Sequence, residues 1–142
     1  IQSRGLVNAS YRKPDRTEAQ PDISYYFNES AINIPDSNTI IDLETYPAPG
    51  LAIEIAATSL NEDLGTKRLL YESLGVKEYW VINVELNEIL AFQILGINGS
   101  QRIYESIVLP GLDLSVLEEA LRSRKTCDDS QIMSQLLVQF QE

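Results

Sequence analysis

The sequence predicts an α/β protein in which helices flank a central mixed β-sheet. Two apolar runs, at residues 51–57 and 79–84, have the composition of strands buried on both faces. An amphipathic segment between them ends near Leu74, and Gly75 is a common helix terminator. These elements form a βαβ unit at residues 51–84, so we expect parallel strands joined by a right-handed crossover.

The segments before this unit carry weaker signals. Residues 1–20 are polar and weakly patterned, and we expect an irregular N-terminal arm, followed by a single domain at 21–142. The aromatic and β-branched sequence at 23–27 predicts a strand. Residues 28–50 contain three prolines and predict a loop with a short strand at 39–43.

The segments after the unit predict a hairpin and two helices. Residues 88–95 and 101–108 flank a glycine-containing turn, which is typical of antiparallel strands and makes the predicted sheet mixed. Helices are expected at 114–124 and 130–140. The second helix has an apolar stripe that either packs on its own domain or forms a homodimer surface.

Composition excludes several kinds of chemistry. The 142 residues include 21 acidic and 11 basic side chains, a net charge of −10, one cysteine and no histidine. Without histidine there is no Ser-His-Asp or Cys-His catalysis, HExxH zinc site or His-ligated metal. The single Cys127 excludes an intrachain disulfide and fits a reducing compartment. No apolar run approaches the ~20 residues that span a bilayer, so we expect a cytoplasmic protein without membrane contact.

The acidic residues are unevenly distributed. Residues 21–65 hold eight acidic side chains and no basic one. One interpretation is a solvated acidic loop around Asp36, Asp42 and Glu44. The other is that some of the eight bind a divalent cation, whose charge a formal count omits.

Glu54 conflicts with its local pattern. It lies in the middle of the apolar run and shares a strand face with Ala52 and Ala56. A carboxylate there is costly to bury unless it is paired or bound to a metal. The alternatives are a structural ion pair, a place at a sheet edge, or a site beside which the two alanines leave room for an ion or water.

Lys67 is a second conflict, because it lies at the centre of the apolar helix stripe. At about 100° per residue, its neighbours on that face are apolar: Leu60, Leu64, Leu70, Tyr71 and Leu74. The lysine either snorkels to solvent or meets Asp63, Glu54 or an anionic ligand. Ser59 or Asn61 is expected to be the N-cap of this helix.

Two further residues of this helix are candidate supporting residues. Arg68 is predicted at the edge of the apolar stripe, where it reaches solvent or a phosphate. Tyr71 continues the four-residue series of Asp63 and Lys67. It is either a core tyrosine with a hydrogen-bonded hydroxyl or a catalytic one.

Asp22 completes a candidate site with Glu54 and Lys67. Pro21-Asp22 alone is a common turn signal, but together these residues bring two carboxylates and a lysine to one edge of a sheet. Two carboxylates can hold Mg²⁺ (or Mn²⁺), which keeps several waters. A bound metal lowers the pKa of a water and stabilises charge on a phosphate, while a lysine orients the water or the phosphate.

These residues also belong to a set of motifs. The motifs are Pro21-Asp22-Ile23-Ser24, the run 51–60 with Glu54, Asp63-x-x-x-Lys67-x-x-x-Tyr71, the segment 75–83 and Leu109-Pro110-Gly111-Leu112. With them the chain resembles the Uma-type restriction endonuclease family of the PD-(D/E)XK nuclease superfamily, over about residues 20–124. The resemblance implies a restriction-endonuclease-like fold for the domain at 21–142. It also implies a divalent metal at Asp22 and Glu54, with Lys67 as the third catalytic residue.

The function that the resemblance implies is metal-dependent endonucleolytic hydrolysis of DNA phosphodiester bonds. The simplest superfamily pattern has a lysine where this chain has Ala56, and Lys67 corresponds to the variant in which the following helix supplies it. Relatives often carry a polar or acidic residue at the place of Ala57. A longer segment precedes their Pro-Asp, so residues 1–20 are expected to be either a natural short form of this front or the remainder of a front that has been lost.

The sequence leaves two other functions open. One is a catalytically impaired relative that acts as an interaction or regulatory protein, and the net charge of −10, which disfavours binding to a DNA duplex, is compatible with it. The other is a small-molecule-binding α/β domain, against which stands the lack of a glycine-rich phosphate loop after any predicted strand.

Overall fold

The computed structural model describes residues 3–14, 17–35, 39–56, 59–96 and 99–123. Its elements are β1 (Ser3–Val7), β2 (Ser10–Arg12), β3 (Glu18–Ala19), β4 (Ile23–Phe27), the 3-10 helix η1 (Asn28–Ala31), β5 (Ile40–Asp42), β6 (Leu51–Ala56), α1 (Leu60–Leu64), α2 (Thr66–Leu74), β7 (Glu78–Asn83), β8 (Glu88–Ile94), β9 (Ser100–Ile103) and α3 (Leu114–Arg122). Within these ranges, one sheet has the order β1-β4-β6-β7-β8-β9 and a smaller one the order β3-β2-β5. None of the described helices is long and apolar enough to cross a bilayer.

The βαβ unit forms the middle of the larger sheet. β6 and β7 pair in parallel, with Glu54 opposite Val81, and both strands are buried along their whole length. β4 and β8 flank them in antiparallel orientation. The predicted mixed sheet and its parallel pair are therefore confirmed.

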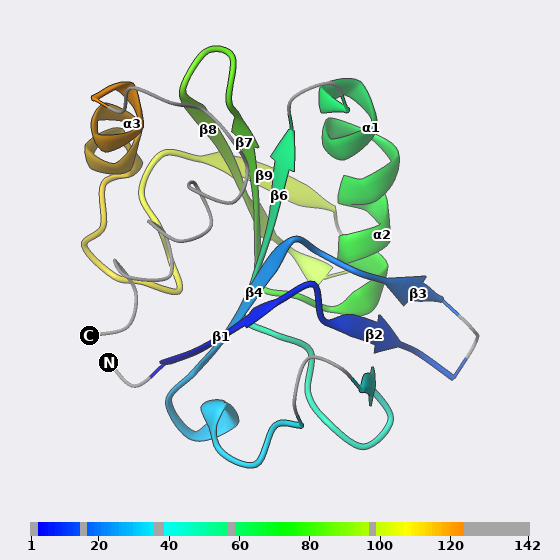
Figure 1. The fold of residues 1–142 in the computed structure, drawn as a ribbon. Coiled ribbons are helices and arrows are strands. Elements are labelled where there is room, and N and C mark those ends of the chain that lie inside the picture. Colours follow the sequence, from blue (N-terminus) through cyan, green and yellow to red (C-terminus); the bar gives the residue numbers. More distant parts are fainter. Residues whose placement is uncertain (1–2, 15–16, 36–38, 57–58, 97–98, 124–142) are drawn as a thin grey trace.

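The two faces of the larger sheet are covered by different helices (Figure 1). Leu51, Ile53 and Ile55 of β6 pack in the cluster that contains α3 residues. Ala52 and Ala56 pack in the cluster that contains α2 residues. This alternation confirms that Glu54 points to the face covered by α1 and α2.

The predicted single helix after β6 is two helices. α1 ends at Leu64 and α2 begins at Thr66, because Gly65 has φ −104° and ψ −92°, outside the helical region. A Cβ at this position would lie 3.1 Å from the Asn61 carbonyl oxygen, so the tight approach favours glycine. Gly75 ends α2 with φ 86°, as the sequence predicted.

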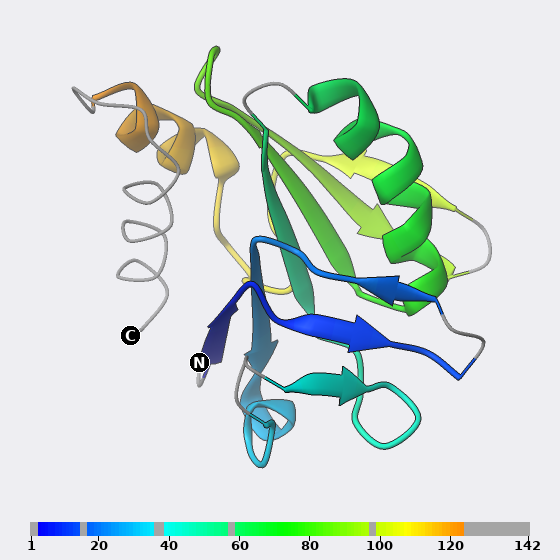
Figure 2. The same ribbon diagram turned by 45° about the vertical axis from the view of Figure 1, so that its right-hand side comes forward.

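The expectation that residues 1–20 are irregular is wrong. β1 pairs antiparallel with β4 at one edge of the larger sheet, and β2 pairs with β3 and β5 in the smaller sheet. Figure 2 shows the smaller sheet beside the C-terminal end of α2. There the Lys13 ammonium donates to the Ser73 carbonyl at 2.5 Å. These strands lack a clear alternation of apolar residues because they are short and half-exposed.

The C-terminal elements follow the prediction with one difference. The hairpin and α3 are present, but β9 ends at Ile103 instead of extending to residue 108. The chain turns away because the Glu78 carboxylate accepts hydrogen bonds from the backbone amides of Ile107 and Val108. The helix predicted at 130–140, with its proposed dimer surface, lies outside the described residues.

Candidate active site

Glu54 is a buried carboxylate on the central strand β6. Its exposed fraction is 3%. One oxygen, Oε1, accepts from the backbone amide of Asp22 at 3.2 Å. The other, Oε2, accepts from the Tyr71 hydroxyl at 2.9 Å and lies 3.4 Å from Lys67 Nζ. Each oxygen therefore has a partner.

Asp22 lies beside Glu54 at the start of β4. The register pairs Ile23 with Ile53 in antiparallel orientation, so Asp22 comes opposite Glu54 one position further. Residues opposite each other in a sheet project to the same face. The Asp22 carboxylate also accepts from the Ile55 amide at 2.8 Å, which holds it against β6.

Lys67 reaches the same place from α2. Its ammonium lies 3.4 Å from Glu54 Oε2 and 3.2 Å from Asp63 Oδ1, and 35% of its side chain is exposed. Of the two interpretations of this lysine, the structure therefore supports the one in which it meets buried carboxylates.

Asp63 is held from two directions. It is only 1% exposed, and its Oδ2 accepts from the Ser59 hydroxyl at 2.9 Å. Its Oδ1 has no hydrogen-bond partner and lies beside Lys67. Its backbone carbonyl accepts from the Tyr79 hydroxyl at 2.9 Å, and the Tyr79 ring stacks on Tyr71 at 4.8 Å between centroids.

Arg68 turns to another part of the molecule. Its guanidinium donates to the Ser100 hydroxyl at 2.7 Å and to the Leu64 carbonyl at 2.8 Å. It also lies over the Phe92 ring at 5.2 Å and 4.0 Å from the Glu72 carboxylate. These contacts join α2 to the β8–β9 hairpin.

The electrostatics of the site reflect an excess of negative charge. Burial raises the pKa of Glu54 from 4.5 to about 7, and the nearby Asp22 carboxylate adds to this, although Lys67 and Tyr71 act against it. For Lys67, burial tends to lower the pKa, but Glu54 and Asp63 outweigh it and raise the pKa above 10.5. The ammonium therefore stays protonated at neutral pH.

The charges of these residues bear on whether the site could hold a magnesium-type ion. When all groups are ionised, Glu54 and Asp63 lie beside the Lys67 ammonium and Asp22 lies beside Glu54, and a divalent cation would balance the excess of two negative charges. In the described ranges, no group of three or more acidic or cysteine side chains is arranged to hold a metal. Asp22 and Glu54 would be the protein ligands, which suits Mg²⁺ because it retains several waters.

Ala56 is one of two departures from the family pattern. It follows Glu54 by two positions on β6 and lies in the core cluster on the same face. Tyr71 of α2 packs in the same cluster. Ala57, the other departure from the family pattern, lies outside the described residues.

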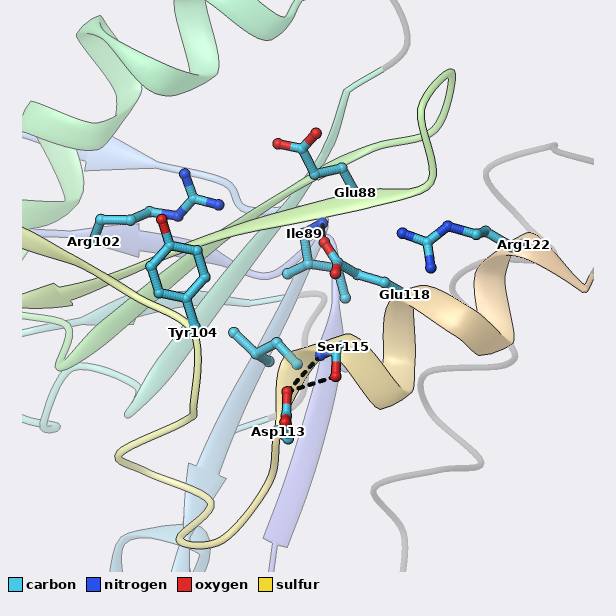
Figure 3. Close-up of a pocket in the computed structure, with 9 residues that line it drawn as sticks. Glu88, Ile89, Arg102, Tyr104, Asp113, Ser115, Glu118 and Arg122 are labelled. Atoms are coloured by element: carbon cyan, nitrogen blue, oxygen red, sulfur yellow. Dashed lines mark hydrogen bonds between the residues drawn. The ribbon is translucent and has the colours of Figure 1, made fainter.

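A hollow of about 350 Å³ lies apart from these residues, between the β8–β9 hairpin and α3 (Figure 3). None of the predicted site residues lines it. Its Asp113 caps α3 by accepting from the Ser115 amide and hydroxyl at 2.9 and 2.8 Å. Its Glu118 accepts from the Ile89 amide at 2.8 Å. These two acids stabilise the fold, and we place the candidate site at Glu54.

Sequence reasoning missed two contributors to the site. Ser59 occupies the expected N-cap position of α1, but its hydroxyl makes no cap hydrogen bond and donates to Asp63 instead. Tyr79 was predicted to be a plain core residue of the second strand. The available signal was that each of these residues carries a hydroxyl group within reach of a helix that bears two charged residues on an apolar face.

The fold has a counterpart among solved structures. The crystal structure of "a putative nuclease belonging to DUF820 from Anabaena variabilis ATCC 29413" matches with a TM-score of 0.54 at 16% identity, over 84% of this chain and 69% of that chain. This likeness confirms the predicted restriction-endonuclease-like class of fold.

The family follows from the sequence itself. The Uma2 family model, described as "Putative restriction endonuclease", matches residues 3–127. The chain therefore belongs to this family, as its motifs indicated. A search of the curated proteins finds no match.

Proposed function

We propose that this chain is a metal-dependent endonuclease that hydrolyses DNA phosphodiester bonds at Asp22, Glu54 and Lys67. The observation that carries the proposal is the approach of Lys67 Nζ to within 3.4 Å of Glu54 on the buried strand next to Asp22. Membership in a family of putative restriction endonucleases supports DNA as the substrate.

Asp22 and Glu54 would hold the metal, Mg²⁺ (or Mn²⁺). When bound, such an ion supplies an activated water and stabilises charge on the phosphate. Glu54 is poised for this role because its pKa of about 7 reflects burial beside another carboxylate, which a cation would relieve. The short contacts of both carboxylates with β4 and β6 fix their separation.

Lys67 acts as a fixed cation. Its raised pKa keeps it protonated at neutral pH, so it donates hydrogen bonds and does not accept the proton of the attacking water. Its 35% exposure lets the ammonium face both the buried carboxylates and an incoming phosphate. It therefore orients the phosphate and stabilises its negative charge.

Asp63 and Tyr71 support these residues. Asp63 holds the ammonium of Lys67 at 3.2 Å, and the Tyr71 hydroxyl holds one oxygen of Glu54 at 2.9 Å. A tyrosine with a pKa raised by burial and by the charge of Glu54 stays protonated and remains a donor.

Nicking of supercoiled plasmid tests the proposal. With Mg²⁺ or Mn²⁺, we expect the parent to nick the plasmid and EDTA to abolish nicking. Glu54→Gln should lower the rate by at least about 100-fold. Glu62→Gln is the matched control, because Glu62 is exposed on the neighbouring helix α1, and it should cut like the parent.

Two results would contradict the proposal. Equal nicking by Glu54→Gln and the parent would remove Glu54 from the reaction. A parent that is folded, binds the metal and cuts no DNA would favour the second candidate, an interaction or regulatory protein on the same fold. The net charge of −10 is the observation that favours this candidate.

A further inference from the structure

Lys67 is a long side chain whose position depends on Asp63. A lysine with 35% exposure keeps much of its rotamer freedom unless its ammonium is held. Glu54 and Asp63 hold it from two sides, and Asp63 is the closer partner at 3.2 Å against 3.4 Å. The placement of Asp63 therefore sets the placement of the cation.

Asp63 itself is held by the Ser59 hydroxyl. Asp63 is 1% exposed, and a buried carboxylate needs donors. Ser59 donates to Oδ2 at 2.9 Å, while Oδ1 lies 3.2 Å from the ammonium of Lys67. Ser59 thus fixes which oxygen of Asp63 faces the lysine.

Tyr79 holds the backbone at the same residue. It lies on β7 opposite Ala52 and is fully buried. Its hydroxyl donates to the Asp63 carbonyl at 2.9 Å, two residues before the break at Gly65. This bond ties the short helix α1 to the sheet that carries Glu54.

We propose that Ser59 and Tyr79 are positioning residues that hold Asp63, and through it Lys67, at the carboxylate pair of the site. The proposal deepens the nuclease function and rests on it for the catalytic consequence. Neither residue touches Lys67 in the contacts described, so both act through Asp63. A merely structural role would lower stability without changing the position or reactivity of the lysine.

Chemical labelling of lysine amines tests the positioning without any DNA. The folded protein is acetylated briefly, and the labelled fraction of Lys67 is measured by mass spectrometry relative to the exposed Lys77. In Ser59→Ala and in Tyr79→Phe, we expect the relative labelling rate of Lys67 to rise about fivefold, as loss of one hydrogen bond predicts. Ser59→Thr retains a hydroxyl and should restore the parent rate.

Controls remove the same chemical groups elsewhere. Ser73→Ala removes a hydroxyl from the exposed end of α2, and Tyr104→Phe removes one from a tyrosine that is 71% exposed. Both should leave the labelling of Lys67 unchanged. Urea unfolding of each variant confirms that the labelled protein is folded.

Cleavage kinetics test the catalytic consequence. For Ser59→Ala and Tyr79→Phe, we expect kcat to fall about tenfold with KM within twofold of the parent, and Ser59→Thr to recover kcat. Unchanged labelling of Lys67 in both variants would overturn the positioning. Raised labelling with unchanged kcat would overturn its catalytic consequence. If labelling of Lys67 rises in the variants but the parent protein cuts no DNA, the nuclease function is refuted and the positioning of Lys67 stands.

Discussion

Two buried glutamates on the neighbouring strands β6 and β7 have opposite surroundings. Glu78 is fully buried, and each of its oxygens accepts from two uncharged donors. Oε2 accepts from Trp80 Nε1 at 2.6 Å and from the Ser106 hydroxyl at 2.9 Å. Oε1 accepts from the amides of Ile107 and Val108 at 2.8 and 3.2 Å. This carboxylate fastens the segment after β9 to the sheet.

Glu54 is almost as buried but lies among charges. Its donors are one amide, one hydroxyl and the half-exposed ammonium of Lys67, and the carboxylate of Asp22 is its neighbour. Burial and Asp22 raise its pKa to about 7. The comparison teaches that burial alone does not mark a functional carboxylate. What distinguishes Glu54 is the second carboxylate and a cation that reaches solvent.

The largest effect on stability is expected at Glu78. Glu78→Ala leaves four donors without their acceptor, two of them on the buried residues Trp80 and Ser106, so the free energy of unfolding should fall by about 3–5 kcal/mol. Urea denaturation measures this, with Glu62→Ala as the exposed control. A loss below about 1 kcal/mol would mean that Glu78 does not fasten the following segment.

Removal of the Lys67 ammonium should have the next largest effect on the free energy of unfolding. In metal-free buffer at pH 8, Lys67→Met leaves Glu54 and Asp63 buried without their ion pair. We expect a loss of about 2–3 kcal/mol, below the value for a fully buried pair because the lysine is half-exposed. Lys77→Met is the exposed control. If the Lys67→Met protein were as stable as the parent, Lys67 would only extend to solvent and would not stabilise the two carboxylates.

The pH dependence of stability should differ between the parent and Glu54→Gln. A carboxyl whose pKa is 4.5 unfolded and about 7 folded binds more protons in the folded state between these values. The free energy of unfolding therefore falls as pH rises from about 4.5 to 7 and then levels off. Without metal, the parent should lose about 2 kcal/mol more over this range than Glu54→Gln. Parallel pH profiles for the two proteins would contradict the raised pKa.

Added Mg²⁺ should give the smallest effect. At ten times its dissociation constant, the ion should raise the free energy of unfolding by roughly 1.4 kcal/mol in the parent. Glu78→Gln should respond like the parent, since Glu78 pairs with Leu51 and projects to the opposite face of the sheet from Glu54. Glu54→Gln should not respond, and an equal response in all three proteins would place the ion elsewhere.

The centre of the fold and the core of the site were predictable from local pattern. The runs at 51–57 and 79–84 have no polar alternation, and Glu54 and Lys67 each contradict an otherwise apolar face. These conflicts are visible in the sequence because strand and helix periodicities are fixed.

The hydrogen-bond donors of Glu78 and the contact of Tyr79 with Asp63 were not predictable from the sequence. Glu78 stands at the first position of a strand, where a charged residue is ordinary, and three of its four donors come from a segment 28–30 residues later. Tyr79 likewise reaches Asp63 only through the packing of β7 against α1. Pairings between distant segments leave no periodic trace in either segment.

Because a helix carries Lys67 and a strand carries Glu54, an inserted residue has a different effect in each of these two elements. One extra residue inside β6 would flip the strand beyond it and send Glu54 to the face covered by α3. One extra residue between Gly65 and Lys67 would turn the lysine by about 100° around α2 and leave the sheet unchanged. We therefore expect relatives to keep the length of β6, which sets the face of Glu54, and the length of the start of α2, which sets the direction of Lys67.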